Sequence, residues 1–464
     1  MDNKENILLY LARKIGMDKA IAYSSGSRIV AGIAGVGSVF FISTFLTGVE
    51  QGFYFTFGSI LALQVFFELG LTGIITQYVA HEASHLQFDE ETCKFTGDQL
   101  YISRLSSLVH FCVKWYSVIS IAVLVVLTIV GVVYFIRYGQ DHNNVSWFYP
   151  WVLVCIGTAI KVFQSPFISF LTGLGKVKEM SKIGFYQQII IPLSTWIGLV
   201  CDFKLYVAGI GYILSVIAWQ IYVNRTKLDK ILINLWNNII VDRVDYVKEI
   251  FPYQWRIALS WVSGYFIFQL FNPVLFATEG AIVAGQMGMT LTVLNAIQSL
   301  SFSWLNTKVP LYSQLIAQKD FVTLDSIFNK SLKQMVTVCL SLLLMFLGGL
   351  LLLNNTQLKF GETIFADRFL GYLPTIFLMI TVYLQQYTNS WATYLRCHKQ
   401  EPFLWYSIFN GIACCLSTLL LGKAFGLYGI VIGYVTIFIL FFPWGYYIYK
   451  TKKTEWHSKI NFQF

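Results

Sequence analysis

Charged residues are scarce in this chain. Asp, Glu, Lys and Arg make up 12% of its 464 residues, whereas soluble domains carry about a quarter of such residues. Hydrophobic residues make up 56%, and apolar runs long enough to cross a bilayer recur along the whole length. This composition excludes an ordinary soluble protein and predicts a polytopic membrane protein.

The apolar runs also lack the alternation of polar and apolar residues that a transmembrane barrel shows. Residues 118–136 and 408–421 are apolar without such alternation, which favours helices over strands. We therefore predict an all-α polytopic membrane protein with about twelve transmembrane spans. The predicted spans are 24–45, 52–78, 115–136, 148–171, 186–201, 205–223, 256–277, 281–304, 334–353, 369–394, 403–421 and 426–448.

Room for a soluble catalytic domain is also missing. The longest predicted segments outside the membrane are about 79–114 and 224–255. No acidic dyad, Ser-His pairing or CxxC motif stands out, and the eight cysteines are scattered without the spacing of a disulfide framework. We therefore expect a protein that is not an enzyme, carries no cofactor and forms no disulfide.

The net charge of +9 is explained by membrane topology rather than by an anionic partner such as nucleic acid. With the predicted spans, most of the 33 Lys and Arg residues lie on the side of the N-terminus. Basic segments are retained in the cytoplasm, so both termini are predicted to be cytoplasmic. The opposite side carries five basic residues: Arg137, Lys204, Lys359, Arg368 and Lys423.

Two arginines lie inside predicted spans and are related by a constant offset. Arg28 and Arg256 are 228 residues apart, and each precedes a glycine, Gly52 or Gly280, by 24 residues. An arginine near the bilayer centre costs about 2.5–3.5 kcal/mol, so a chain that keeps one in each half is expected to use them on something anionic. The alternative is that both side chains extend to the lipid headgroups.

The offset predicts a duplication that divides the chain into two lobes of six spans. The N-terminal lobe is 1–223, the C-terminal lobe is 256–464, and 224–255 is a cytoplasmic linker. Apolar residues recur at helical spacing in this linker, which predicts a helix that lies in the membrane interface. Six spans per lobe give both lobes the same orientation, and such halves commonly enclose a cavity at the midplane.

Other polar residues also lie within the spans. Gln64 and Glu68 share one face of the second span, Lys161 lies in the fourth, and Asn295 belongs to a polar stripe on the eighth. Glu68 is either one partner of a structural ion pair, with Arg28 or Lys161 available, or a proton or sodium coupling site. The residues that we expect to contact substrate are Arg28, Arg256, Lys161, Gln64 and Asn295.

One motif suggests a zinc protease. The segment His81-Glu82-Ala83-Ser84-His85 matches HExxH at the end of a span. Catalytic zinc needs a third protein ligand, and Asn272-Pro273-Val274-Leu275 lacks the acid that an intramembrane metalloprotease places after Asn-Pro. We therefore expect no metal site and predict a polar cluster at the cytoplasmic end of the second span.

Three stretches near the second span carry a family resemblance: Glu50-Gln51-Gly52-Phe53-Tyr54-Phe55-Thr56-Phe57, Leu63-Gln64-Val65-Phe66-Phe67-Glu68-Leu69-Gly70-Leu71 and Gln77-Tyr78-Val79-Ala80-His81-Glu82. They resemble the Wzx-type polysaccharide flippases, which handle O-antigen and other lipid-linked oligosaccharides and belong to the MATE/MOP superfamily. The turn Gly173-Leu174-Gly175-Lys176 adds to this resemblance, and the twelve-span layout covers nearly the whole chain.

The resemblance implies two six-helix lobes arranged as a V around a cavity that alternates between the two sides of the bacterial inner membrane. It implies translocation of an undecaprenyl-pyrophosphate-linked oligosaccharide for the biosynthesis of surface polysaccharide such as lipopolysaccharide. The implied partners are this lipid-linked glycan, membrane lipid and the polysaccharide polymerase machinery. Basic residues line the cavity in such proteins, and Arg28, Arg256 and Lys161 are candidates by position.

Other functions stay open. A MATE-like exporter of drugs or small solutes would have the same fold, and it would favour carboxylates in the cavity. A lipid-linked glycan polymerase would need a large outer loop, which the predicted topology lacks. An intramembrane metalloprotease depends on the HExxH match alone, and a membrane scaffold without transport activity is the remaining class.

Overall fold

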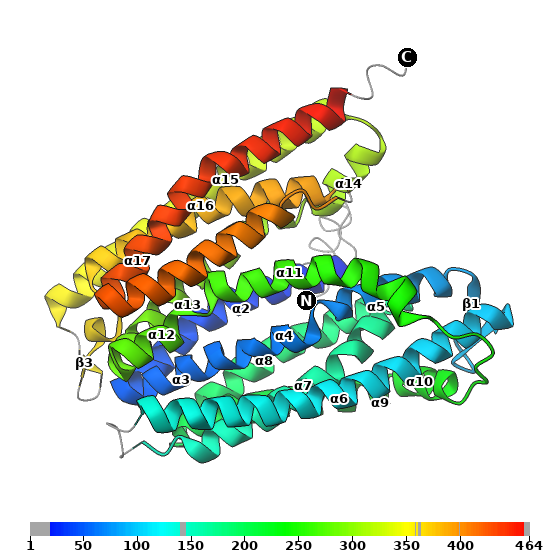
Figure 1. Cartoon of the computed structure of the whole chain (residues 1–464), viewed down its shortest axis with the longest axis horizontal. Coiled ribbons are helices and arrows are strands. Elements are labelled where there is room, and N and C mark those ends of the chain that lie inside the picture. The colour runs from blue at the N-terminus through cyan, green and yellow to red at the C-terminus, as the bar shows by residue number, and fades with distance from the viewer. Residues whose placement is uncertain (1–18, 140–144, 358, 361–362, 399, 459–464) are drawn as a thin grey trace, which may run out of the picture.

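The two halves of the chain form helical bundles that converge at one end and diverge at the other. The computed structural model describes residues 19–139, 145–357, 359–360, 363–398 and 400–458. Within this part, seven helices are long and apolar enough to cross a membrane, or eight if one bent pair counts as a single span. The predicted all-α polytopic membrane fold is confirmed, and Figure 1 shows the bundles spreading apart away from the hairpin of β3 (Lys359–Phe360).

The N-terminal half accounts for the first six predicted spans. A hairpin and the long α6 follow the second span, and short turns join most of the other helices. Its elements are α2 (Lys19–Phe45), α3 (Gly48–Leu61), η1 (Ala62–Gln64), α4 (Val65–Glu68), α5 (Leu71–Ala83), β1 (Leu86–Asp89), β2 (Lys94–Gly97), α6 (Gln99–Tyr138), α7 (Phe148–Gly173), α8 (Val177–Val200), η3 (Lys204–Tyr206) and α9 (Val207–Arg225).

The linker and the C-terminal half supply the remaining spans. The seventh predicted span is divided between α11 and α12, and two short strands form a second hairpin. The elements are α10 (Leu228–Trp236), η4 (Tyr246–Ile250), α11 (Phe251–Phe268), α12 (Phe271–Thr278), α13 (Ala281–Asn306), α14 (Val309–Ala317), α15 (Phe321–Thr356), β3, β4 (Thr363–Ile364), η5 (Phe365–Arg368), α16 (Tyr372–Arg396) and α17 (Leu404–Ser458).

Side chains next to the helices explain where several of them begin and turn. Thr47 and Glu50 form a capping box at the start of α3, with each side chain accepting a hydrogen bond from the other residue's backbone N–H. Asp98 accepts from the N–H of Leu100 at the start of α6. Gly426 has a φ of 57° inside α17, so the last two predicted spans are two segments separated at this glycine.

Helices of one half pack on helices of the other in a symmetric way. Helix α2 of the N-terminal half packs on α13, where Leu300 fills the space beside Gly32. The first helix of the C-terminal half, α11, packs on α4 and α5, where Ile257 fills the space beside Gly70. In terms of the predicted spans, the first packs on the eighth and the seventh packs on the second. Such reciprocal packing is expected when a duplication gives both lobes the same orientation.

The two halves approach each other closely where α3 crosses α13. A Cβ atom at Gly52 would overlap the backbone of Ala281, and one at Gly285 would lie 2.9 Å from the Gly52 nitrogen and 3.2 Å from the Gly48 oxygen. Small residues allow helix backbones to approach closely within a membrane. Gly52 thus lies against Ala281, the residue that directly follows Gly280, its counterpart in the repeat.

The linker helix α10 packs on protein as well as facing outward. Leu228, Ile231 and Leu235 are buried, and α10 contacts α6 and α9. The ring of Trp236 stacks on His110 with centroids 3.8 Å apart, whereas Ile233 is 53% exposed. The helix therefore packs on the N-terminal bundle through one face and leaves its other face exposed.

The α3–α13 crossing generates a stability prediction. Gly52→Ala should destabilise the protein by about 1–3 kcal/mol because the added methyl group has no space beside Ala281. Gly58→Ala in the same helix is the matched control: nothing lies within 4 Å of its Cβ position, so its effect should stay within about 1 kcal/mol. Thermal unfolding of the purified proteins, followed by tryptophan fluorescence, measures both, and equal unfolding temperatures for the two variants would contradict the packing described.

Candidate functional site

The second predicted span is broken between two helices. Helix α4 ends at Glu68, Leu69 and Gly70 both have left-handed backbone with φ of 48° and 68°, and α5 then begins at Leu71. The segments on either side are bent by 43°. A Cβ atom at Gly70 would collide with Ile257 of α11, so both the backbone angle and the packing require glycine here.

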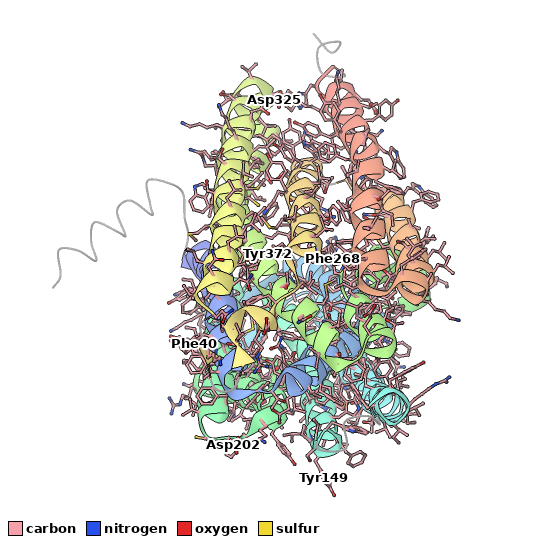
Figure 2. The ribbon with its side chains drawn as sticks, turned by 90° about the vertical axis from the view of Figure 1, so that its left-hand side faces the viewer. Phe40, Tyr149, Asp202, Phe268, Asp325 and Tyr372 are labelled. Atoms are coloured by element: carbon pink, nitrogen blue, oxygen red, sulfur yellow. The ribbon has the colours of Figure 1, made fainter. Side chains whose placement is uncertain are left out.

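A pocket lies beside this break, between the two halves. It has a volume of about 320 Å³, and α11 supplies its aromatic wall while η1 and α4 supply two polar side chains. Phe268, one of the wall residues, lies where the two bundles meet (Figure 2). Broken membrane helices commonly mark binding sites. The lining residues are Ala62, Gln64, Val65, Glu68, Trp261, Gly264, Tyr265, Phe268 and Gln269.

Glu68 interacts electrostatically with a half-buried lysine from the same half. Lys161 of α7 is its electrostatic partner, and the Lys161 ammonium lies 4.8 Å from the ring centroid of Tyr212 in α9. A carboxylate inside a membrane protein is expensive unless a cation offsets it. Lys161 is one of the two predicted partners of Glu68, and the side chain of the other, Arg28, lies outside the described part of the structure.

The predicted site residues are only partly brought together. Gln64 and Glu68 line one pocket, and Lys161 is coupled to Glu68 from inside the N-terminal bundle. Asn295 is exposed on α13 and does not line this pocket. Arg28 and Arg256 lie in α2 and α11, and their side chains fall outside the described part of the structure.

A polar seam joins the halves at the convergent end of the molecule. The Gln51 amide nitrogen donates to the carbonyl oxygens of Gly285, at 2.8 Å, and Arg368, at 3.1 Å. The Arg368 side chain is buried and interacts electrostatically with Glu50, and Asn272 donates to the Ser59 hydroxyl at 3.2 Å. Each of these contacts joins α3 to the C-terminal half, so the seam closes the end opposite to the diverging bundles.

Sequence reasoning missed the seam and the aromatic wall. Two signals for the seam were present: Gln51 stands directly before the repeated glycine, and Arg368 is one of the few basic residues on the predicted outer side. Trp261 and Tyr265 carried no usable signal, because aromatic residues make up 17% of the chain and their positions resemble ordinary membrane packing.

The HExxH segment forms a charge cluster at the end of α5. Glu82 is 3% exposed, and its carboxylate accepts from the Arg104 guanidinium at 3.1 Å. His85 stacks on Tyr101 with centroids 4.2 Å apart. Within the described residues, no group of three or more His, Cys, Asp and Glu side chains could hold a metal ion. Glu82 thus has a structural partner, in agreement with the predicted polar cluster.

Comparisons with known proteins identify the fold. No family model matches the chain, and no curated protein matches its sequence. A multidrug resistance MATE family transporter of the MOP superfamily in its outward-facing conformation matches with a TM-score of 0.55 and 12% identity, over 95% of this chain and 96% of that one. A transporter of the same description in its inward-facing conformation matches with a TM-score of 0.53 and 13% identity, over 92% and 99%.

A third similar structure has a different binding pocket. It is a MOP superfamily transporter from Pyrococcus furiosus, described as having a pocket of reverse polarity that suggests a different function. It matches with a TM-score of 0.51 and 12% identity, over 94% of this chain and 96% of that one. At such identities the similarity establishes the fold, and this polytopic membrane protein has the fold of the MATE transporters of the MOP superfamily.

The Glu68–Lys161 pair can be tested by a double-mutant cycle. Lys161→Met should destabilise the protein by about 2 kcal/mol because it leaves a carboxylate inside the membrane without its cation. Glu68→Gln in the same background should recover most of that loss, because no unpaired charge is then left. Thermal unfolding of the wild type, the two single variants and the double variant measures the coupling. Strictly additive effects would show that the two residues do not form a pair.

Proposed function

We propose that this protein translocates a polyprenyl-pyrophosphate-linked oligosaccharide across the bacterial inner membrane. The observation that carries the proposal is the placement of the two arginine-bearing helices. Helix α2, which contains Arg28, packs on α13 of the other half, and α11, which contains Arg256, packs on α4 and α5. Both intramembrane arginines therefore come from helices at the boundary between the halves, where a transported molecule would pass.

The charge at this boundary favours an anionic cargo. The lipid pyrophosphate is a strong acceptor of charge-assisted hydrogen bonds, and the planar guanidinium group suits such oxygens. The carboxylate of Glu68 is offset by Lys161, so it does not cancel the two arginines. Gln64 and Gln269 in the neighbouring pocket offer amide groups that suit sugar hydroxyls.

Alternating access of the boundary would move the cargo. The bundles diverge at the end where α10 and β1 lie (Figure 1), which is the end that the basic loops predict to be cytoplasmic. The seam at Gln51 closes the other end. In this state a lipid-linked glycan would be loaded from the cytoplasmic leaflet, and release would require the seam to open while the diverging ends approach each other.

The membrane potential would assist the return step. After release of the anionic cargo, the boundary keeps its positive charge. An inside-negative potential favours the inward-open state by about 2.3 kcal/mol per charge and 100 mV if the charge crosses the whole field. The potential alone could then drive the reset, and Glu68 would act as a structural partner of Lys161 rather than as a coupling site.

Export of a small organic cation is the second candidate. Trp261, Tyr265 and Phe268 form an aromatic wall opposite Glu68, and aromatic faces beside a carboxylate attract cations. The similar MATE structures are described as multidrug resistance transporters. The flippase remains the first proposal because Lys161 already offsets the carboxylate on which the exporter would depend.

The proposal predicts that the two arginines are required for export. Arg28→Ala combined with Arg256→Ala should abolish surface polysaccharide in a deletion strain and should cause the undecaprenyl-pyrophosphate oligosaccharide to accumulate, because the pyrophosphate loses its cationic contacts. Gel electrophoresis of surface glycan and mass spectrometry of the lipid fraction measure the two quantities. Arg137→Ala, which removes an exposed basic residue at the end of α6, is the matched control and should complement the deletion fully.

Two results would count against the flippase. Normal surface glycan in the double arginine variant would show that the two arginines at the boundary are not required for export. Normal glycan in the deletion strain itself, with increased sensitivity to cationic dyes, would favour the exporter instead. Membrane levels of each variant, measured by immunoblot, separate loss of function from loss of the protein.

A further inference from the structure

The linker between the two halves is fastened along the first turns of α6. The Ser103 hydroxyl accepts hydrogen bonds from the backbone N–H groups of Val241, at 2.7 Å, and Asp242, at 2.8 Å, and donates to the Asp242 carbonyl at 3.0 Å. The N–H of Val244 donates to the Ser107 hydroxyl at 3.2 Å. Ser103 is completely buried. A segment without regular secondary structure thus has its backbone hydrogen bonds satisfied by serines of α6.

Arg104, the next residue of α6, binds three carboxylates. Its guanidinium contacts Glu82 of α5 at 3.1 Å, Asp242 of the linker at 3.3 Å and Glu249, two residues before α11, at 2.5 Å. The arginine side chain is 18% exposed and that of Glu82 is 4% exposed. The five donors of a guanidinium group lie in a rigid plane, so one arginine can bridge several carboxylates in a defined geometry.

Further contacts continue this attachment up to the start of α11. The Tyr78 hydroxyl of α5 donates to the Glu249 carbonyl at 2.5 Å, and Tyr246 stacks on Phe111 of α6 with centroids 5.2 Å apart. These partners all belong to the N-terminal half. The linker therefore enters α11 while it is held against the bundle that precedes it in the sequence.

Helix α11 lies between the two halves. Ile257 and Trp261 lie against Gly70 of the N-terminal half, and Tyr265 and Phe266 pack on Phe66 of α4 with ring centroids 5.3 Å and 5.8 Å apart. Ser263 lies in the space beside Gly411 of α17, in the C-terminal half. The helix therefore contacts both halves, while the linker attaches its start to the N-terminal bundle.

We propose that Arg104 is a positioning residue for α11. Its bridges to Glu82, Asp242 and Glu249 keep the linker and the first half of α11 on the N-terminal bundle. Relative movement of the two halves then takes place beyond the start of α11, and the linker itself does not open. Arg256 belongs to the held part of α11, so the clamp also determines which half carries that arginine.

The physical basis is the excess of negative charge in the clamp. Arg104 neutralises one of three carboxylates that converge on it. Removing the arginine would leave Glu82, Asp242 and Glu249 to repel one another around a partly buried position. The linker would be pushed from α6 because Asp242 and Glu249 can separate from the buried Glu82 only by moving outward.

Hydrogen exchange of the full-length protein in lipid nanodiscs tests the clamp directly. In Arg104→Ala, amides of residues 241–258 should exchange about tenfold faster or more, the equivalent of losing one or two charged hydrogen bonds, because the linker opens. Residues 259–268, which contact α4 and α17 without involving Arg104, should keep the wild-type rate. Arg104→Lys should give an intermediate rate because an ammonium group cannot bridge three carboxylates in one plane.

The matched control is a salt bridge within the other half. Lys453 contacts Asp325 at 2.8 Å, with side chains 24% and 27% exposed, and Figure 2 shows Asp325 at the far end of the C-terminal bundle. Lys453→Ala should leave exchange at 241–258 unchanged. Loss of protection there in both variants would mean a general loss of stability and would overturn the assignment to Arg104.

Three further outcomes decide the proposal. Unchanged exchange at 241–258 in Arg104→Ala would show that the bridges do not hold the linker. Equal acceleration across all of α11 would show that Arg104 does not act on the start of that helix in particular. Faster exchange at 241–258 with undiminished surface glycan would show that Arg104 does not position α11 for transport. Only the surface-glycan readout depends on the proposed function. If the wild-type gene failed to restore surface glycan in the deletion strain, the proposed function would be wrong and the exchange result would still stand.

Discussion

The crossing of α3 and α13 holds the two halves of this protein together. Gly52 and Gly285 bring two helix backbones into contact, and Gln51 can then reach the Gly285 and Arg368 carbonyls. A bilayer supplies no water for unpaired polar groups, so such a contact is stable only when its hydrogen bonds are made within the protein. Because the halves are fixed at this end, the helices that bear Arg28 and Arg256 lie along the boundary that opens at the other.

Charged side chains in the predicted spans and at their ends are offset by opposite charges in several places of the described structure. Lys161 offsets Glu68, Arg368 faces Glu50, and Arg104 binds three carboxylates at the end of α5. The first interaction lies within the N-terminal bundle, the second lies at the seam, and the third attaches the linker to the N-terminal bundle. The arginines of α2 and α11, which lie in predicted spans, are the basic groups that we propose to bind the cargo.

The fold was largely predictable because hydrophobic length and charge asymmetry act locally along the chain. All twelve predicted spans fall on helices, including 403–421 and 426–448 on either side of Gly426. The site was less predictable, because it depends on which helices meet. The break at Leu69 and Gly70, the wall from Trp261 to Phe268, and the three partners of Arg104 join residues that are distant in sequence or unremarkable in type. The HExxH segment is the opposite case, because a motif is present in the sequence but Glu82 contacts Arg104 in the structure.

The central claim is that the boundary between the halves passes a lipid-linked pyrophosphate. The most direct test reconstitutes the purified protein in liposomes that contain a fluorescent undecaprenyl-pyrophosphate disaccharide and follows how much of it an external reagent, unable to cross the membrane, can quench. With the wild-type protein, we predict that the reagent quenches a larger fraction of the fluorescence than the fraction of labelled lipid in the outer leaflet. With the Arg28→Ala, Arg256→Ala variant, the quenched fraction should equal that of protein-free liposomes. Quenching that stays at the protein-free level with active, folded wild type would contradict the claim.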